Sequence, residues 1–553
     1  MIKQILNQKS KHLKLADYII LGIIVLGYTI LSFINLGSTK NPQTFYEFNK
    51  NESIILEFNE LTDVIKLKLY NGEISGKYYL YASTDDKTYT YIKDIDGNGS
   101  FSWNNERILV KAKYIKITAK TEDSNIGNIS FYDNNKKPIE VINSKSSVVN
   151  KDKKTICLID ELKETPSNIN FMNTTYFDEI YFARTAYEYA NNKQAYEWVH
   201  PPLGKLIQAV PIKMFHKMAP FYYRLMGNIA GIIMIIVMYI FSKNMFETRK
   251  YAILGSLLMT FDTFHFAQTR IGTVDSFLVL FIMLSYLFMY RYIIFNKHKN
   301  LFLSGLFIGC AIAVKWTGLY AGLGLAIMFL THVIKNHLID IKLILKSILF
   351  FIIMPITIYI SSYLVYPNIQ VNYTNSIPNI LTQTKDMYNY HSSLTEDHPF
   401  SSNWYTWPLS YKPVWYYVNE IDTNKKETIT GIGNIVIWWL GIISLIYIVI
   451  KLLKDHSKKA YILLISILSM WLPYLFIGRV MFLYHYFPVL PFVMLAIVYL
   501  IKDLTERLKT DFFLVSYIIL FTITFIAYYP VVSGTAINPN YINSLKLLSS
   551  WIF

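Results

Sequence analysis

The sequence predicts a polytopic α-helical membrane protein of about eleven transmembrane helices, with a β-sandwich inserted in its first outer loop. Hydrophobic residues make up 53% of the 553 residues and charged residues only 16%, a balance far from that of soluble proteins. Apolar runs of about 20 residues, the length that crosses a bilayer core, recur along the chain. Between the first two runs, short alternating segments indicate strands instead.

The apolar runs predict the transmembrane helices in order. The first is too long and uninterrupted for a signal peptide, so we interpret it as a retained anchor. The two short runs on either side of Lys315 could instead form one kinked hairpin. The predicted spans are 17–36, 222–243, 249–266, 272–294, 301–315, 317–334, 343–366, 432–453, 460–477, 481–501 and 512–530.

The basic residues predict the orientation. If the N-terminus is cytoplasmic, every predicted inner segment carries several Lys or Arg, as the positive-inside rule requires. Much of the formal charge of +15 is then explained by topology, and a nucleic-acid partner is not needed. We therefore expect a multi-pass cell-membrane protein with an extracytoplasmic C-terminus and two large outer segments, 37–221 and 367–431.

The β-sandwich is expected within the first outer segment. Runs such as SIILEFN and KYIKITA alternate apolar and polar residues, and turns such as DIDGNGS separate them. The stretches YLYASTDDKTYTYIKD and AKYIKITA resemble the discoidin-like, galactose-binding sandwiches. The insert could be a spacer or packing lid, or it could bind glycan or polypeptide.

Chemically capable side chains gather on the predicted outer face. They come from six loops far apart in the sequence, and charged groups at a membrane are costly unless they serve a pathway or a site. This convergence favours an enzyme whose site opens outward. The candidates are Asp178, Glu179, His200, Lys205, Arg224, Arg270, Asp275, Lys315, Trp316, His391, Trp407, Arg479 and His485.

Each candidate also has a purely structural explanation. Asp178 and Glu179 could simply begin a helix, where acids complement the macrodipole. Arg270 and Asp275 could form an ion pair across a turn, and Trp-rich outer loops are expected at any membrane interface. Neighbouring helical residues point about 100° apart, so only one of Asp178 and Glu179 is expected to act on the reacting atoms.

Several motifs resemble, in order and content, those of the protein O-mannosyltransferases, a GT-C family of membrane glycosyltransferases classified as family 39. They are the Asp-Glu pair, HPPLGK, RIGTVDSF, VKWTG, the WP-rich loop and MFLYHYFPVLPF. The resemblance covers nearly the whole chain except about 40–165. The eukaryotic members carry a MIR domain in the later outer loop, which here is too short for one, so the chain looks like a bacterial-type member. Acceptor recognition by MIR domains therefore cannot be carried over.

The resemblance implies transfer of mannose from polyprenyl phosphate mannose to Ser or Thr hydroxyls of exported proteins. By match to the family motif, Asp178 would be the base, with Glu179 beside it. The other candidates would bind the donor phosphate or the substrate, with Glu179 and Asp275 orienting them. No metal or other cofactor is expected. The partners would be the lipid-linked donor, secreted or membrane acceptor proteins and membrane lipid.

Alternatives remain open at this point. A related polyprenyl-phosphate-sugar transferase could glycosylate lipid or wall glycan, and a transporter would also span the membrane many times. Transport predicts charges near the mid-membrane, whereas here they lie at predicted outer ends. The expected domains are the N-terminus with the first helix (1–40), the sandwich (41–150), a connector and catalytic loop with interfacial helices (151–221), helices 2–7 (222–366), the second outer loop (367–431), and helices 8–11 with the C-terminal tail (432–553).

Overall fold

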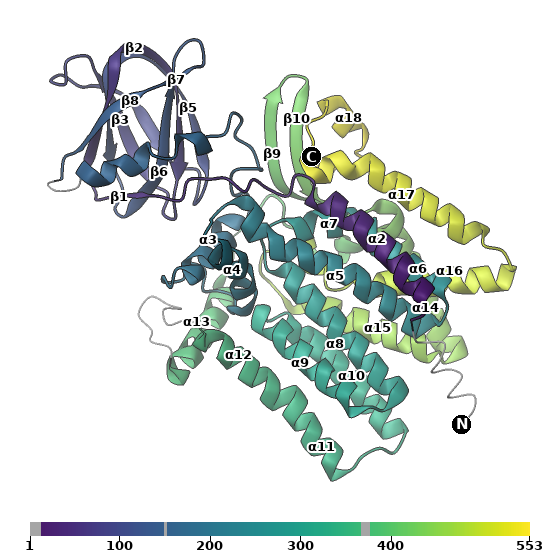
Figure 1. Ribbon diagram of the computed structural model, residues 1–553. Helices are drawn as coiled ribbons and strands as arrows, with labels where there is room; N and C mark the ends of the chain where they lie inside the picture. Colours follow the sequence, from purple (N-terminus) through teal and green to yellow (C-terminus); the bar gives the residue numbers. More distant parts are fainter. Residues whose placement is uncertain (1–12, 149–151, 366–375, 397) are drawn as a thin grey trace. The chain divides into compact units, whose positions relative to one another are not determined.

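The computed structural model describes residues 13–148, 152–365, 376–396 and 398–553. The chain forms two compact units. The helical unit takes its described residues from 13–35, 191–208 and 224–553, and the β unit comprises residues within 36–190 together with 209–223. The predicted helical membrane protein with a β-rich insert is confirmed (Figure 1).

Helices α2 and α5–α18 make up most of the helical unit (Figure 1). Their bounds are α2 Leu15–Phe33, α5 Pro220–Phe246, α6 Arg249–Thr260, α7 Thr263–Arg270, α8 Asp275–Phe295, α9 His298–Val314, α10 Gly318–Lys335, α11 Ile341–Ile348, α12 Met354–Leu364, α13 Ile377–Ser393, α14 Ile435–Asp455, α15 Lys458–Trp471, α16 Leu490–Leu508, α17 Phe512–Ser533 and α18 Pro539–Ser544.

In the described part of the chain, eight helical stretches are long and apolar enough to cross a membrane. They are α2, α5, α8, α10, the continuous stretch Ile341–Leu364, α14, Lys458–Phe476 and α17. Of the other three predicted spans, the short run 301–315 corresponds to α9, which has 17 residues. The remaining two differ from the expectation: 249–266 divides into α6 and α7, and α16 begins only at Leu490. The count of about eleven spans stays a prediction.

The division between α6 and α7 has a local cause. Asp262 follows the end of α6 and its Oδ1 accepts a hydrogen bond from the backbone N–H of His265 (2.8 Å), which is the contact of an N-cap residue. The other carboxylate oxygen accepts from Trp438 Nε1 (2.8 Å). A polar residue inside an apolar run therefore starts a new helix, because both of its oxygens find donors.

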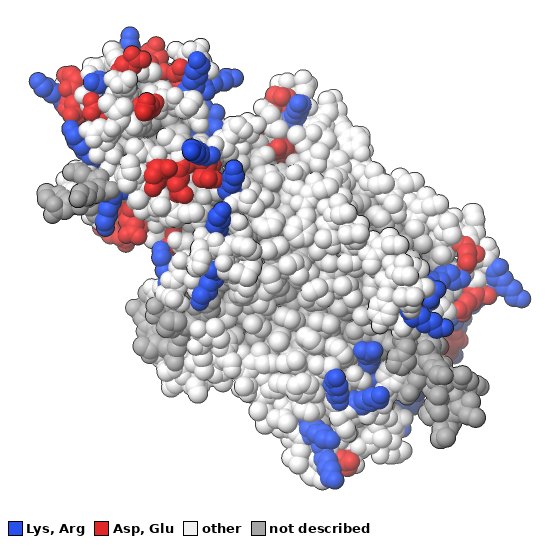
Figure 2. Space-filling model, in the orientation of Figure 1, with Lys and Arg blue, Asp and Glu red and all other residues white. Residues whose placement is uncertain are grey.

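The surface of the helical unit fits a bilayer. Figure 2 shows a broad region without Lys, Arg, Asp or Glu on the face in view, with basic side chains gathered beyond it. Large apolar side chains on several helices are exposed, including Leu453 (71%) on α14 and Ile526 (64%) on α17. An exposed apolar surface of this extent indicates lipid contact, so the chain is a multi-pass membrane protein.

The β unit contains an antiparallel sheet that folds on itself. Its eight strands within the described residues are β1 Tyr46–Phe48, β2 Ser53–Asn71, β3 Lys77–Ser83, β4 Thr90–Asp96, β5 Trp103–Ala119, β6 Ser124–Tyr132, β7 Pro138–Ile139 and β8 Val141–Ser146. The long strands β2 and β5 pair along most of their length, with a break in register between Glu57 and Thr62. On one side of the break β2 pairs with β8, and on the other with β6.

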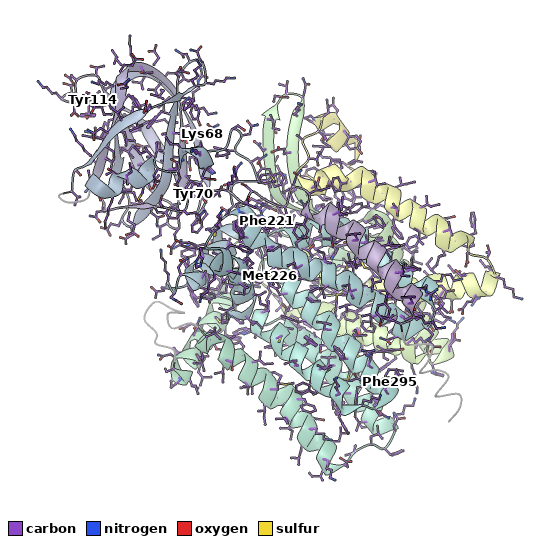
Figure 3. All side chains as sticks on the ribbon, viewed as in Figure 1. Lys68, Tyr70, Tyr114, Phe221, Met226 and Phe295 are labelled. Atoms are coloured by element: carbon purple, nitrogen blue, oxygen red, sulfur yellow. The ribbon has the colours of Figure 1, made fainter. Side chains whose placement is uncertain are left out.

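Alternation along β2 fills the core of this unit. Ile54, Leu56 and Phe58 are fully buried while the residues between them are not, which is the period-2 pattern of a strand with one face inward. Each such side chain contributes about 1.5–3 kcal/mol by burial. The connector after β8 is bound to the sheet by Lys68, which Figure 3 labels. Its Nζ donates to the carbonyl oxygens of Pro166 (2.5 Å) and Ser167 (2.9 Å).

Two helices lie in the segment between the sheet and the second predicted span. α3 spans Glu179–Ala190 within the β unit, and α4 spans Leu203–Phe215. The predicted second outer loop also has regular structure: α13 and a hairpin of β9 (Val414–Asp422) and β10 (Lys425–Gly431). The aromatic-rich loop 367–431 was expected only as a loop.

Candidate active site

A cavity of about 600 Å³ lies within the helical unit. Its walls come from the start of the HPPLGK run, the turn between α9 and α10, α13, and the segment that follows α15. These segments are far apart in the sequence. Six of the predicted site residues line this one cavity: His200, Lys315, Trp316, His391, Arg479 and His485. Trp407 does not line it.

The lining of the cavity favours an anion. Among the described residues that line it are two permanent cations, Lys315 and Arg479, and three histidines, but no Asp or Glu. Fixed cations in a site with little water interact with an anion far more strongly than they would in bulk water. A phosphate group matches this donor set, and Arg is well suited to phosphate because its planar fork presents several N–H groups.

Arg479 is held by a neutral histidine. Its guanidinium NH1 donates to His391 Nδ1 (2.6 Å) and His391 Nε2 donates to the carbonyl oxygen of Val199 (2.7 Å). This arrangement requires the tautomer with hydrogen on Nε2 only. Burial lowers the pKa of His391 to about 4, and nearby His200 and Arg479 act in the same direction. His391, on α13, thereby orients the guanidinium of Arg479 without neutralising its positive charge.

Lys315 is oriented by Asp275. Its Nζ lies 2.9 Å from Asp275 Oδ1 and 5.5 Å from the ring centre of Tyr484. Asp275 begins α8, and Lys315 follows the last residue of α9, so the pair joins the ends of two adjacent helices. The alternative that Arg270 and Asp275 form a simple ion pair gains no support, since the cation bound to Asp275 is Lys315.

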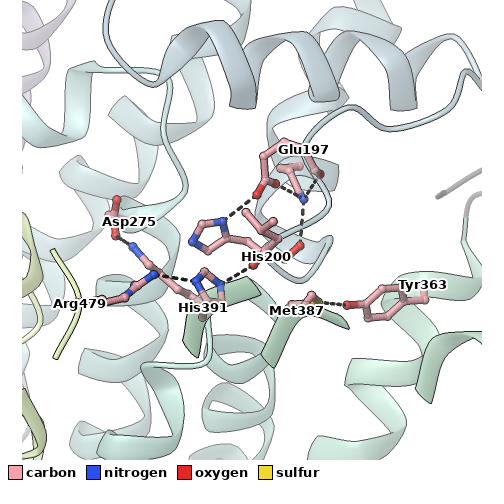
Figure 4. A network of polar contacts seen from close by, with 10 residues as sticks. Glu197, His200, Asp275, Tyr363, Met387, His391 and Arg479 are labelled. Atoms are coloured by element: carbon pink, nitrogen blue, oxygen red, sulfur yellow. Dashed lines mark hydrogen bonds and ion pairs between the residues drawn. The ribbon is translucent and has the colours of Figure 1, made fainter. Parts of the chain in front are cut away.

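Glu197 is a site residue that the sequence analysis missed. Its Oε1 lies 2.8 Å from His200 Nδ1, and its Oε2 is paired with Lys205 Nζ (Figure 4). Burial raises the pKa of Glu197, but Lys205 and His200 outweigh burial and lower it to about 2. Its role could have been predicted from its position three residues before His200, because a carboxylate at that spacing can reach a histidine across one turn of the chain.

Of the two tryptophan candidates, Trp316 lines the cavity and Trp407 packs against a residue that lines it. Trp407 is fully buried and stacks on His485, with ring centres 5.9 Å apart and planes 13° apart. His485 Nδ1 contacts the backbone of Phe482, which also holds the ring in place. Trp407 therefore supports His485, whereas Trp316 is part of the cavity wall itself.

The predicted phosphate ligands Arg224, Arg270 and Lys205 do not line this cavity. The guanidinium of Arg270 donates to the carbonyl oxygens of Ser32 (3.1 Å), Ile34 (2.5 Å) and Asn35 (2.9 Å), so it satisfies the C-terminal end of α2. Arg224 is 1% exposed in α5. The contacts of Arg270 place a cation at the carbonyl end of a helix, where it complements the macrodipole.

Asp178 and Glu179 belong to the β unit, at the beginning of α3. The carbonyl oxygen of Asp178 accepts from Phe182 N (3.1 Å), which opens the helix, and its side chain is half-buried. Glu179 is fully buried and its Oε2 accepts from Tyr176 N (3.2 Å). The two acids thus have different surroundings, as their adjacent positions on a helix require, and their catalytic roles stay predictions.

Potential metal ligands do not gather in the described part of the chain: no group of three or more His, Cys, Asp or Glu side chains is placed to hold a metal ion there. Metal-independent chemistry stays a prediction. The cavity's cations are themselves able to neutralise a phosphate.

Comparisons with known proteins identify the family of this chain. The family described as dolichyl-phosphate-mannose-protein mannosyltransferase matches residues 209–370, and the C-terminal four-transmembrane region of protein O-mannosyltransferase matches 377–551. Together the two regions cover more than half of the chain and contain Arg270, Lys315, His391 and Arg479.

Individual relatives are similar over long stretches. A polyprenol-phosphate-mannose–protein mannosyltransferase of Mycobacterium tuberculosis is 23% identical over 455 residues, covering 68% of this chain and 87% of the relative. The dolichyl-phosphate-mannose–protein mannosyltransferase 4 of Saccharomyces cerevisiae is 32% identical over 122 residues, 19% of this chain and 16% of that protein.

The fold has a counterpart among solved structures. A chain of the Saccharomyces cerevisiae protein O-mannosyltransferase Pmt1–Pmt2 complex, bound to its sugar donor, aligns with a TM-score of 0.60 at 13% identity, covering 68% of this chain and 89% of that chain. At that identity the likeness establishes the shared fold. With the two matched family regions, it confirms the resemblance found in the motifs: the chain belongs to the protein O-mannosyltransferase family of GT-C membrane glycosyltransferases.

Proposed function

We propose that the chain transfers mannose from polyprenyl phosphate mannose to Ser or Thr hydroxyls of exported proteins. The observation that carries this proposal is the cavity whose described lining residues include Lys315, Arg479 and three histidines. A lipid-linked sugar phosphate carries the negative charge that such a wall would hold. The curated relatives that resemble the chain over most of its length are named for this donor and for protein acceptors.

A lipid-linked donor also fits the edge of the cavity. Among the lining residues, Phe476 is 84% exposed and Tyr388 64% exposed, and Leu475 beside Phe476 is 58% exposed. Large apolar side chains exposed beside a cationic cavity offer a path for a polyprenyl chain while the phosphate stays on the cations. A soluble nucleotide sugar has no apolar chain that could bind along that path.

The reaction has two requirements that this chain's residues could meet. A Ser or Thr hydroxyl is a poor nucleophile at neutral pH, and a positioned base accelerates its attack by about 10²–10⁴-fold. Asp178 is the proposed base, and attack at the anomeric carbon opposite the phosphate would invert its configuration in one step. The electrons of the broken bond then pass to the phosphate oxygen.

The leaving phosphate gains charge as this bond breaks. Arg479 and Lys315, already oriented by His391 and Asp275, are the proposed groups that stabilise it. Because they are fixed in advance, they need little reorganisation when the charge develops. We place this chemistry on the extracytoplasmic face, with the N-terminus in the cytoplasm.

The nature of the acceptor is tested by removing the gene from its host. We expect Ser- and Thr-linked hexose to disappear from exported proteins, as measured by mass spectrometry of the secreted fraction, and to return with the wild-type gene but not with Asp178→Asn. Unchanged protein hexose combined with loss of sugar from a lipid or wall glycan would refute a protein acceptor. Transport would be indicated if sugar-linked lipid accumulated without any transfer reaction in purified protein.

A further inference from the structure

Glu197 lies outside the cavity wall, and its carboxylate binds two residues of the HPPLGK run at once. Oε1 is 2.8 Å from His200 Nδ1, and Oε2 accepts from Lys205 Nζ. The same ammonium donates to the carbonyl oxygens of Glu197 (2.7 Å) and His200 (2.9 Å). Lys205 is fully buried and Glu197 is 7% exposed, so this contact closes the loop 197–205 in surroundings with little water.

The position of Glu197 determines how His200 meets the cavity. His200 Nδ1 faces a carboxylate with a low pKa, so it carries a hydrogen and donates. Figure 4 shows the second ring nitrogen, Nε2, on the side of the imidazole away from Glu197, and His200 is part of the cavity wall. In the neutral ring Nε2 accepts a hydrogen bond, and it can donate to a phosphate oxygen only after the ring takes up a proton.

Two described cations and a second histidine near His200 oppose that proton. Lys205 and Lys315 repel an imidazolium, and the ring of His391 lies 5.4 Å from the ring of His200. Burial lowers the pKa of His200 below its ordinary value, and Glu197 is the group that acts in the opposite direction. These groups together favour neutral His200 in the free protein, while an incoming anion would add a second negative charge near the ring.

We propose that Glu197 is a positioning residue that makes His200 a proton-dependent phosphate donor. When the phosphodiester of the lipid-linked sugar enters the cavity, His200 takes up one proton from solvent at Nε2 and donates it in a hydrogen bond to a phosphate oxygen. The imidazolium then lies between two anions, the carboxylate and the phosphate. No bond of the donor is broken in this step, and the inference rests on the proposed function only in taking a phosphodiester as the ligand.

Calorimetry of the purified full chain tests the inference without measuring transfer. The probe is a short-chain isoprenyl phosphoryl mannose, whose phosphodiester keeps one negative charge from pH 5.5 to 8. Titrations in buffers of different ionisation enthalpy give the number of protons taken up on binding. The wild type should take up close to one proton where His200 is neutral in the free protein, and its affinity should weaken up to about tenfold per pH unit as the pH rises.

The variants assign the proton to this pair. His200→Gln should bind without proton uptake, Glu197→Gln should lose most of the uptake and about tenfold in affinity near pH 6, and Glu197→Asp should recover part of both. Asp17→Asn is the matched control, because Asp17 is also a buried carboxylate paired with a cation, Arg249 (3.0 Å), and does not line the cavity. It should bind and take up protons as the wild type does.

The outcomes separate this inference from the proposed function. Full proton uptake and wild-type affinity in Glu197→Gln would overturn the role of Glu197, and binding by the wild type without uptake would overturn the role of His200. If Glu197→Gln unfolds at a lower temperature than Asp17→Asn, the proton uptake of Glu197→Asp compared with that of His200→Gln still decides whether Glu197 controls the proton on His200. A wild type that binds with uptake yet glycosylates no peptide would refute the function alone, whereas no binding of the probe would overturn both.

Discussion

Replacing Arg479 by Met should reduce the kcat of mannose transfer. The contacts of the Arg479 side chain allow the size of the reduction to be estimated. Arg479 lines the cavity, and its guanidinium makes a single hydrogen bond to the described part of the chain, 2.6 Å to His391 Nδ1. The rest of the guanidinium is therefore available to the donor phosphate. Loss of one such fixed donor to a developing anion typically costs about 2.7–4 kcal/mol, or about 10²–10³-fold in kcat.

Arg479→Lys should be intermediate, because the charge stays but the planar fork is lost. The assay is the initial rate of hexose transfer to a Ser/Thr peptide by purified protein, with kcat and KM separated. Arg507→Met is the control, since Arg507 is exposed in the last turn of α16, and it should retain the wild-type rate. A kcat for Arg479→Met within threefold of the wild type would refute the assignment of Arg479 to the leaving phosphate.

Three further predictions concern single residues. Asp178→Asn should leave a folded, membrane-inserted protein with kcat reduced at least about 10²-fold, and a near-normal rate would exclude Asp178 as the base. His391 has a pKa lowered to about 4, so between about pH 4 and 6.5 the unfolded chain binds more protons at this residue than the folded chain does. The unfolding temperature should therefore fall as the pH drops through that window. It should fall less steeply in His391→Gln. Trp407→Ala should destabilise the protein by about 3–5 kcal/mol, because Trp407 is fully buried; an unchanged unfolding temperature in detergent would contradict this.

The membrane architecture was predictable because hydropathy reports it directly. Long apolar runs identify spans whatever their neighbours, and alternation in runs such as SIILEFN identified the buried face of β2. The break between α6 and α7 was missed because Asp262 is a single polar residue in an apolar run. Its capping contact and its bond to Trp438, 176 positions later in the chain, become visible only in three dimensions.

Part of the site was predictable for a related reason. In a chain with few charges, a Lys or Arg at the end of an apolar run is informative, and Lys315 and Arg479 do line one cavity. Glu197 was missed because it lies in a polar loop where a carboxylate attracts no notice. The contacts of Arg270 with the carbonyl oxygens at the end of α2 join residues more than 230 positions apart, a pairing that no local pattern contains.

The central claim is that this chain moves a hexose from a polyprenyl phosphate to a hydroxyl of a polypeptide. The most direct measurement is the mass of a Ser/Thr-containing peptide after incubation with purified protein and polyprenyl phosphate mannose, with the modified residue located by fragmentation. We predict addition of one hexose on Ser or Thr by the wild type, and strongly reduced addition by Arg479→Met and Asp178→Asn. An unmodified peptide, with hexose appearing instead on an added lipid or glycan acceptor, would contradict the claim.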